Sequence, residues 1–313
     1  MSTLSKWKDL PTEAIHPASL AMDTASTKEL LNLMVTEDRK VINAVSKERS
    51  RIETAADLIV SKLQKSGRIF LVGAGTSGRL GVLEAAEMIA TFSTPPNLVR
   101  AVMPGGRSGF FHDKEGSEDN FEEGARAIRQ LKPKRKDILI GISASGMTQF
   151  VRGALSKARQ NGVTIIFITC WPGTELQTFV DVVIAPAVGP EVIAGSTRLK
   201  AGTATKLVLN MLTTISMVKI GKTYGNLMVD IKTGSEKSRD RACRIVTMAT
   251  GLSHEEAGTL LRRARWNVKI AIVMQKTGKT YSGAASQLKR FGDSVRSAVG
   301  EDLQRSLMTR KGQ

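Results

Sequence analysis

Short runs of apolar, mostly β-branched residues alternate with stretches of helical periodicity through the middle of this chain. Strands that are apolar on both faces are typical of a parallel sheet covered by helices on each side. The sequence therefore predicts an α/β fold whose ligands bind in the loops at the carboxyl ends of the strands. The predicted strands are residues 69–72, 98–103, 138–142, 164–169 and 180–185, and the predicted helices between them are 77–90, 119–130 and 149–160.

The segments on either side of this alternation have different patterns. Residues 1–27 lack helical periodicity and are expected to form an extended lead-in, whereas 26–63 carry apolar residues at helix spacing. Residues 199–219 are expected to form one long buried helix, and 235–300 a helical region without strands. We therefore expect a lead-in and helix at 1–52, an α/β domain at 53–220, and a linker with a small helical domain at 221–313.

Charge and composition narrow the choice of partners. The 313 residues include 46 Lys and Arg against 29 Asp and Glu, and the net charge of +17 suits nucleic acid, an anionic membrane or an anionic small molecule. Aromatic residues make up only 4% of the chain, which argues against stacking surfaces for nucleic acid, and 26–65 contain no helix-turn-helix. The two cysteines and three histidines lack the spacing of a disulfide framework or a metal site. With no apolar signal core and no membrane-length apolar run, we expect a soluble cytoplasmic protein that binds no membrane, metal or specific nucleic acid.

The first predicted strand runs into a glycine-rich loop, Gly73-Ala-Gly-Thr-Ser-Gly78, that opens a helix. Glycine lets the backbone approach a phosphate, and the helix N-terminus offers free N–H groups and the positive end of its dipole. Gly75, Thr76 and Ser77 are therefore candidate phosphate ligands. The alternatives are a purely structural turn and a dinucleotide site, although the second strand ends without the acid that would bind the ribose hydroxyls.

Two further hydroxyl-rich loops follow the third and fifth predicted strands. Taken singly, each could be a turn with a serine N-cap. Because all three loops follow strands of one parallel sheet, we expect them to converge into a pocket of hydroxyl and amide donors suited to a phosphorylated polyol. The candidate substrate-binding residues of these two loops are Ser143, Ser145, Thr148, Ser196, Thr197 and Lys200.

Two glutamates lie on a predicted helix, 78–90, that is otherwise apolar nearly all round. Such a helix is expected to be buried, and Glu84 and Glu87 both fall on its Leu80 side. A buried carboxylate is either paired or functional, and desolvation would raise its pKa as a general acid requires. Glu87 is the stronger candidate, and an ion pair with an arginine is the structural alternative.

An acidic cluster follows the second predicted strand and consists of Glu115, Glu118, Asp119, Glu122 and Glu123. Acids in the first turn of a helix stabilise its free N–H groups and its dipole. The residues by themselves favour this structural interpretation.

These motifs together closely resemble the sugar-isomerase (SIS) domain of the N-acetylmuramic acid 6-phosphate etherases, from about residue 12 to 300. The matching segments are Gly73-Ala-Gly-Thr-Ser-Gly-Arg-Leu-Gly with Glu84-Ala-Ala-Glu87, Glu115-Gly-Ser-Glu118-Asp119, Gly195-Ser-Thr-Arg-Leu-Lys-Ala-Gly-Thr-Ala204 and Lys222-Thr-Tyr-Gly-Asn-Leu-Met-Val-Asp230.

The resemblance implies a lyase that cleaves the D-lactyl ether of N-acetylmuramic acid 6-phosphate to N-acetylglucosamine 6-phosphate and D-lactate. By resemblance, Glu87 and Glu118 are the catalytic pair, no cofactor is used, and the substrate is a phosphorylated amino sugar. The family fold is an αβα sandwich with a five-stranded parallel sheet and a small helical C-terminal domain. The family also implies a homodimer that acts in amino-sugar catabolism and peptidoglycan recycling.

The chain departs from the family pattern in three places. The usual Ala-Ser-Gly-Arg-Thr-Pro-Tyr is here Ala144-Ser-Gly-Met147-Thr-Gln149-Phe150. Met88-Ile-Ala90 replaces Cys-Pro-Pro, and Ser235-Glu-Lys replaces Asn-Glu-Lys. Two other functions on the same domain remain alternatives: a non-catalytic sugar-phosphate-binding regulatory protein, and an aldose–ketose sugar-phosphate isomerase.

Overall fold

The structure, a computed structural model, describes residues 10–112, 116–301 and 303, and these divide into two compact units. The first unit contains the residues up to Ala85 together with Pro96–Thr213, and the second contains Ala86–Pro95 and the residues from Thr214 on. Helices α3 (Gly75–Phe92) and α7 (Lys200–Lys219) each begin in the first unit and end in the second. A functional division at 52/53 and 220/221 stays a prediction.

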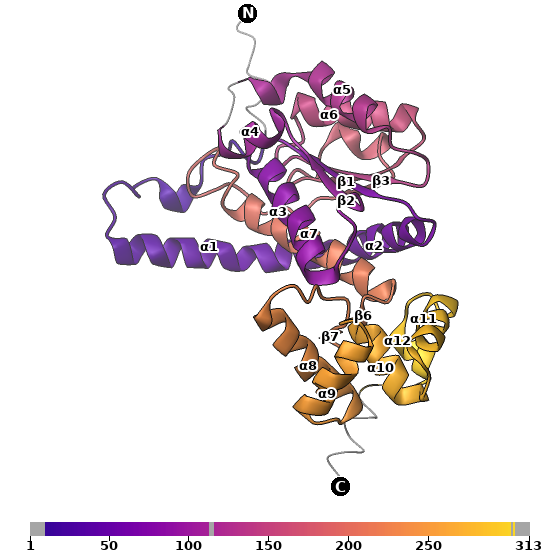
Figure 1. The fold of residues 1–313 in the computed structure, drawn as a ribbon. Coiled ribbons are helices and arrows are strands. Elements are labelled where there is room, and N and C mark those ends of the chain that lie inside the picture. Colours follow the sequence, from indigo (N-terminus) through magenta and orange to yellow (C-terminus); the bar gives the residue numbers. More distant parts are fainter. Residues whose placement is uncertain (1–9, 113–115, 302, 304–313) are drawn as a thin grey trace, which may run out of the picture. The chain divides into compact units, whose positions relative to one another are not determined.

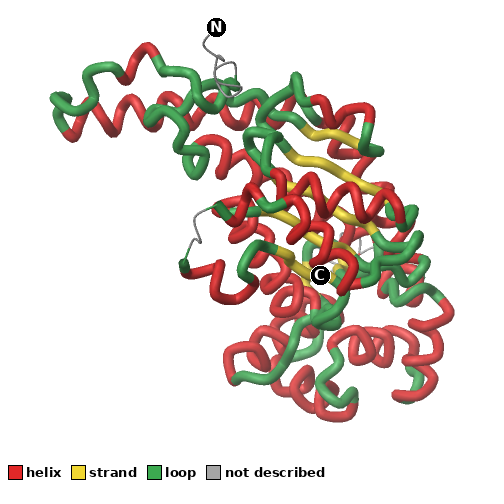
Figure 2. The backbone as a smooth tube through the Cα atoms, turned by 90° about the horizontal axis from the view of Figure 1, so that it is seen from above, coloured by secondary structure: helices red, strands yellow, loops and turns green. Residues whose placement is uncertain are grey.

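A five-stranded parallel sheet lies at the centre of the first unit, which confirms the α/β prediction (Figures 1 and 2). The strand order is β2-β1-β3-β4-β5, so the chain crosses over between β2 and β3. Each strand of this sheet begins and ends within two residues of its predicted bounds. The strands are β1 (Ile69–Gly73), β2 (Val99–Val102), β3 (Ile138–Ile142), β4 (Thr164–Ile168) and β5 (Val182–Ile184).

Both faces of the sheet are apolar because helices cover each of them (Figure 2). On one face, a row of paired residues, Phe70, Leu139 and Ile165, belongs to a core shared with α5 (Phe121–Leu131) and α6 (Gln149–Gln160). On the other face, α3 packs so closely on β1 that a Cβ added at Gly81 would lie 3.3 Å from the Cβ of Leu71.

The helical stretch predicted at 26–63 is two helices, α1 (Thr27–Lys47) and α2 (Arg49–Gln64). The break falls at Glu48, whose φ of −90° and ψ of 9° are not helical. The Glu48 carboxylate is buried and accepts the N–H of Ala185 at 2.9 Å, just beyond the edge strand β5. The break therefore ties α2 to the edge of the sheet. The remaining helical segments of this unit are η1 (Pro17–Ser19), α4 (Gly106–Phe111), η2 (Ser117–Asp119) and η3 (Glu175–Thr178).

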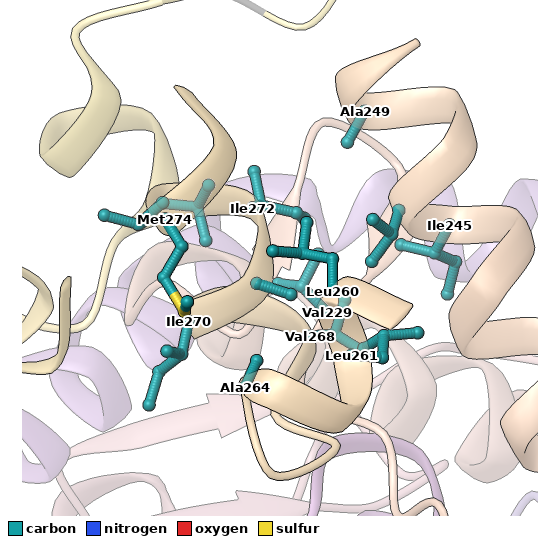
Figure 3. Close-up of a cluster of buried hydrophobic side chains, with 14 of the residues drawn as sticks. Val229, Ile245, Ala249, Leu260, Leu261, Ala264, Val268, Ile270, Ile272 and Met274 are labelled. Atoms are coloured by element: carbon teal, nitrogen blue, oxygen red, sulfur yellow. The ribbon is translucent and has the colours of Figure 1, made fainter. Parts of the chain in front are cut away.

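The second unit contains a short antiparallel pair, β6 (Thr223–Tyr224) and β7 (Leu227–Met228), and is helical over 235–300, as predicted. Its core joins side chains such as Ile245, Leu260 and Ile272 (Figure 3). No helix in the described ranges is long and apolar enough to cross a bilayer. The helices are α8 (Glu236–Thr250), α9 (His254–Arg263), α10 (Val268–Thr277), α11 (Tyr281–Arg290) and α12 (Val295–Val299).

We predict that Ile140→Ala lowers the free energy of unfolding by about 2–5 kcal/mol, because Ile140 is fully buried in the central strand β3 and the truncation leaves a cavity. Urea unfolding followed by circular dichroism measures the change. Ile15→Ala is the control, since the Ile15 side chain is 70% exposed and its truncation should change stability by less than about 0.5 kcal/mol. Equal effects of the two substitutions would contradict this packing.

Candidate active site

The first glycine loop is a tight turn between β1 and α3. A Cβ added at Gly73 would lie 2.7 Å from the backbone N of Gly78, and one added at Gly78 would lie 2.6 Å from the Gly73 oxygen, so neither position accommodates a side chain. Gly75 has a φ of +52°, in the left-handed region that favours glycine. The turn places the half-buried Thr76 and Ser77 in the first turn of α3 at the carboxyl end of β1.

The second loop, Ser143–Thr148, is held together by its own hydroxyls and by the loop after β4. The Ser143 and Thr148 hydroxyl oxygens are 2.8 Å apart, and the Ser145 hydroxyl accepts the N–H of Met147 at 3.3 Å. The oxygen of Ala144 accepts bonds from the Thr169 hydroxyl and the Cys170 N–H. This loop begins beside the first one, because Gly73 and Ile142 are paired residues of β1 and β3.

Cys170 is not a candidate nucleophile. Burial, with the nearby Glu191 carboxylate, raises the pKa of its thiol to about 12, so the thiol stays protonated at neutral pH.

The third loop, Gly195–Leu199, leads into α7. Its Ser196 and Thr197 are half-buried, and the N–H of Gly195 donates to the oxygen of Thr12 at 3.0 Å. A Cβ added at Gly202, in the first turn of α7, would lie 3.6 Å from both the Thr197 oxygen and the Thr76 methyl group. The first and third loops therefore lie close together, and the second begins beside the first. That the three loops bind a phosphosugar stays a prediction.

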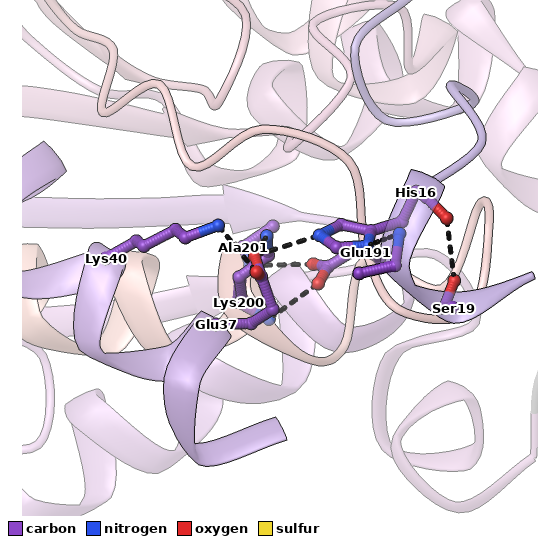
Figure 4. A network of polar contacts seen from close by, with 8 residues as sticks. His16, Ser19, Glu37, Lys40, Glu191, Lys200 and Ala201 are labelled. Atoms are coloured by element: carbon purple, nitrogen blue, oxygen red, sulfur yellow. Dashed lines mark hydrogen bonds and ion pairs between the residues drawn. The ribbon is translucent and has the colours of Figure 1, made fainter. Parts of the chain in front are cut away.

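The Lys200 side chain is buried in an ion pair and is not exposed to a ligand. It is only 3% exposed, and its Nζ lies 2.8 Å from Oε2 of Glu37 on α1 (Figure 4). The backbone N–H groups of Lys200 and Ala201 donate to the buried Glu191 carboxylate at 3.0 and 2.9 Å, which caps α7. We therefore assign Lys200 a positioning role at the start of α7.

Glu37 collects three donors in this buried network. His16 Nε2 lies 3.1 Å from Glu37 Oε2, and Lys40 Nζ lies 2.5 Å from Oε1. The Ala18 N–H donates to His16 Nδ1, so the ring proton sits on Nε2, facing Glu37. Burial alone would raise the pKa of Glu37, but the hydrogen bonds from Lys200, Lys40 and His16 and the Lys200 charge outweigh it and lower this pKa to about 2.

The two glutamates of α3 have opposite environments. Glu84 is buried, with Oε2 2.9 Å from Lys206 Nζ and Oε1 accepting the Thr213 hydroxyl at 2.5 Å. Glu87, three residues further on, is exposed, and Leu83 is 42% exposed. The expectation that this helix is buried all round is wrong, because α3 buries only one side. Of the two acids, Glu84 is the buried and paired one, with a lysine as its partner.

Glu118 lies in η2, directly before α5. Its side chain is exposed, and η2 contacts α6, the helix that follows the second loop. The cluster's dipole interpretation holds for Glu122 and Glu123, which occupy the first turn of α5 behind the N-cap Asn120. Glu115 lies outside the described residues.

Across the described ranges, no group of three or more His, Cys, Asp or Glu side chains could hold a metal ion.

The fold and these loops define a SIS-domain protein. The glucokinase regulatory protein N-terminal SIS domain matches residues 51–159, and the SIS domain matches 130–215. Three curated relatives are each named N-acetylmuramic acid 6-phosphate etherase. The relative from Trichormus variabilis is 46% identical over 96% of this chain and 97% of its own length, that from Rubrobacter xylanophilus 46% over 94% and 97%, and that from Clostridium acetobutylicum 45% over 92% and 95%. The chain belongs to the N-acetylmuramic acid 6-phosphate etherase family.

We predict that Glu37→Gln destabilises the protein at pH 7 by about 3 kcal/mol or more, because it leaves the buried Lys200 ammonium without a counter-charge. The folded-state pKa of Glu37 is depressed to about 2, so its contribution is present above the ordinary value of 4.5 and is lost as the pH falls toward 2. The difference in urea midpoint between wild type and variant should therefore shrink between pH 7 and pH 3.

The exposed Glu53, replaced by Gln, is the control for this experiment. A wild-type advantage over Glu37→Gln that does not change between pH 7 and pH 3 would show that the Glu37 charge contributes nothing to folding.

Proposed function

We propose that this protein is an N-acetylmuramic acid 6-phosphate etherase, a carbon–oxygen lyase that releases D-lactate and leaves N-acetylglucosamine 6-phosphate. Family membership over more than nine-tenths of the chain carries this proposal. The three hydroxyl-rich loops support it, since free N–H groups and hydroxyls at the carboxyl edge of a parallel sheet suit a sugar phosphate.

The reaction requires two proton-transfer groups. A base removes the carbon-2 proton of the open-chain aldehyde, which is acidic because it lies next to the carbonyl. Lactate then leaves carbon 3 as its ether oxygen takes a proton from an acid, and the carbon 2–carbon 3 double bond forms. The group that has lost its proton activates water, which adds to carbon 3 while carbon 2 is protonated again. Two carboxylates can perform all of these transfers.

We assign Glu118 as the carbon-2 base and Glu87 as the acid and water base. Both carboxylates are exposed in the described chain, so a substrate can reach them. Glu84 is unsuited to either task because Lys206 and Thr213 already occupy its two oxygens. Gly75, Thr76, Ser77, Ser143, Ser145, Thr148, Ser196 and Thr197 are proposed to bind the phosphosugar, with Lys200 supporting the third loop from behind.

Incubation of the purified protein with N-acetylmuramic acid 6-phosphate tests the proposal and separates it from the two alternatives. D-lactate release identifies the etherase, an isomerised sugar phosphate identifies the isomerase, and binding without turnover identifies a regulatory protein.

We predict that Glu118→Gln abolishes both lactate release and exchange of the carbon-2 proton with solvent deuterium. Glu87→Gln should block lactate release yet leave carbon-2 exchange measurable, because the first proton transfer does not use Glu87. Loss of one acid–base group costs about 10²–10⁴-fold in rate. Deuterium incorporation by NMR and a lactate assay on the same samples measure both effects.

Glu122→Gln is the matched control, an exposed acid four residues from Glu118 in the first turn of α5. Loss of exchange in Glu87→Gln but not in Glu118→Gln would reverse the two roles. Near-normal lactate release by both variants would refute the mechanism.

We further propose a homodimer that acts in cytoplasmic peptidoglycan recycling. Leu31, Val35 and Ile42 lie on one side of α1 and are 59%, 44% and 56% exposed. Exposed apolar side chains gathered on one side of a helix suit a protein–protein contact. Light scattering at micromolar concentration should give a dimer, and Leu31→Glu with Ile42→Glu should shift it toward monomer. A wild-type monomer would contradict the proposal.

The net charge of +17 is proposed to steer the anionic substrate, with no sequence-specific reading of nucleic acid. We predict that kcat/KM falls as salt shortens the Debye length to about 8 Å at 0.15 M, whereas kcat changes little. Initial rates across a sodium chloride series check this. Salt-independent kcat/KM, or tight sequence-selective DNA binding at 0.15 M salt, would overturn it.

A further inference from the structure

The second loop carries a methionine where the etherase family usually has an arginine. Arg152 follows this methionine, Met147, by five residues and lies in the first half of α6. The Arg152 Nη2 lies 3.7 Å from the Met147 Sδ, and the Arg152 N–H donates to the oxygen of Thr148 at 3.1 Å. The guanidinium of Arg152 thus lies against the side chain that replaces the family's arginine.

This guanidinium has spare hydrogen-bonding capacity. Its Nε–H is buried and has no acceptor among the described residues. Its Nη2 lies 3.5 Å from an oxygen of Glu175, whose side chain is 68% exposed, and the Met147 sulfur is a weak acceptor. A buried N–H is normally bonded, so this guanidinium is incompletely satisfied within the described chain. The Arg152 side chain is 20% exposed, so part of it is open to an anion.

Two lysines of α7 have closer counter-charges than Arg152 does. Lys200 is neutralised by the buried Glu37, and Lys206 by the buried Glu84. Arg152 instead lies beside a loop with the Ser145 and Thr148 hydroxyls, at the positive end of the α6 dipole. The planar fork of a guanidinium matches the oxygens of a phosphate or a carboxylate in two parallel hydrogen bonds.

We propose that Arg152 binds an oxyanion of the substrate. Its guanidinium would take the place of the arginine that the family usually has at the position of Met147. The inference rests on the proposed function for the identity of the substrate. That substrate offers two oxyanions, the 6-phosphate and the lactyl carboxylate.

The experiment compares the KM and kcat of wild type, Arg152→Met, and the double variant Met147→Arg with Arg152→Met. Arg152→Met should raise KM about 10–100-fold with kcat within a few-fold, since one charge-assisted pair is lost from binding. The double variant should recover most of the loss, because the guanidinium returns from position 147. Arg159→Met is the control on the same helix, since Arg159 is exposed and pairs with Asp181.

Glu175→Gln separates binding from structure. If Arg152 only forms an ion pair with Glu175, then Glu175→Gln and Arg152→Met should have equal effects on KM and melting temperature, and this result would overturn the proposal. An unchanged KM in Arg152→Met, or no recovery in a folded double variant, would overturn it as well.

Calorimetric titration distinguishes the two oxyanions and separates failure of this inference from failure of the proposed function. Weaker binding of N-acetylglucosamine 6-phosphate to Arg152→Met assigns the phosphate, and weaker binding of N-acetylmuramic acid 6-phosphate alone assigns the carboxylate. If wild type binds these sugars without releasing lactate, the etherase proposal fails while the titration still tests Arg152. If both sugars bind wild type and Arg152→Met equally, the inference about Arg152 fails, and the proposed etherase function is unaffected.

Discussion

The ion pair between Glu37 and Lys200 joins two parts of the chain that are 163 residues apart in sequence. It fixes the first residue of α7 against α1, and the Glu191 carboxylate caps the same helix end from a second direction. The loop that carries Ser196 and Thr197 ends at this point. A hydroxyl group contributes more to binding when its backbone is already fixed before the ligand arrives. By fixing the end of this loop, the buried ion pair helps to preorganise the candidate site.

The acids of this protein divide by burial into two kinds. Glu37, Glu84 and Glu191 are buried, and each accepts hydrogen bonds from cations or helix N–H groups. For Glu37 these bonds lower the pKa of the carboxyl group, which makes it a poor proton donor at neutral pH. Glu87 and Glu118 are exposed, and in the proposed mechanism the bound substrate would itself desolvate them. The two acids proposed to transfer protons are therefore exposed in the free protein, whereas the three buried acids are already hydrogen-bonded.

The sheet was predictable because its strands are apolar on both faces, and β3 and α6 have the predicted bounds. The break at Glu48 was not predictable, since helical periodicity continues through it and the Glu48 carboxylate bonds the N–H of Ala185, 137 residues away in sequence. The same limit applies to the site. Periodicity places Glu84 and Glu87 on one side of a helix, but the partner that neutralises Glu84 comes from α7, 122 residues later. His16, isolated in sequence, gave no signal of its contact with Glu37.

The electrostatics of the three loops connect these observations. Hydroxyls and helix N–H groups supply partial charges, whereas a phosphate monoester carries close to two negative charges at neutral pH. A pocket built only from such groups leaves much of that charge uncompensated, and the nearby Lys200 and Lys206 are committed to buried acids. Under our proposal Arg152, which is only loosely paired with Glu175, compensates the remaining negative charge of the substrate. The start of α6 is a suitable place for this cation, because residues one turn into that helix stay beside the loop from which the helix begins. A guanidinium at position 152 and a guanidinium at position 147 would therefore lie at the same edge of the sheet, where the substrate is proposed to bind.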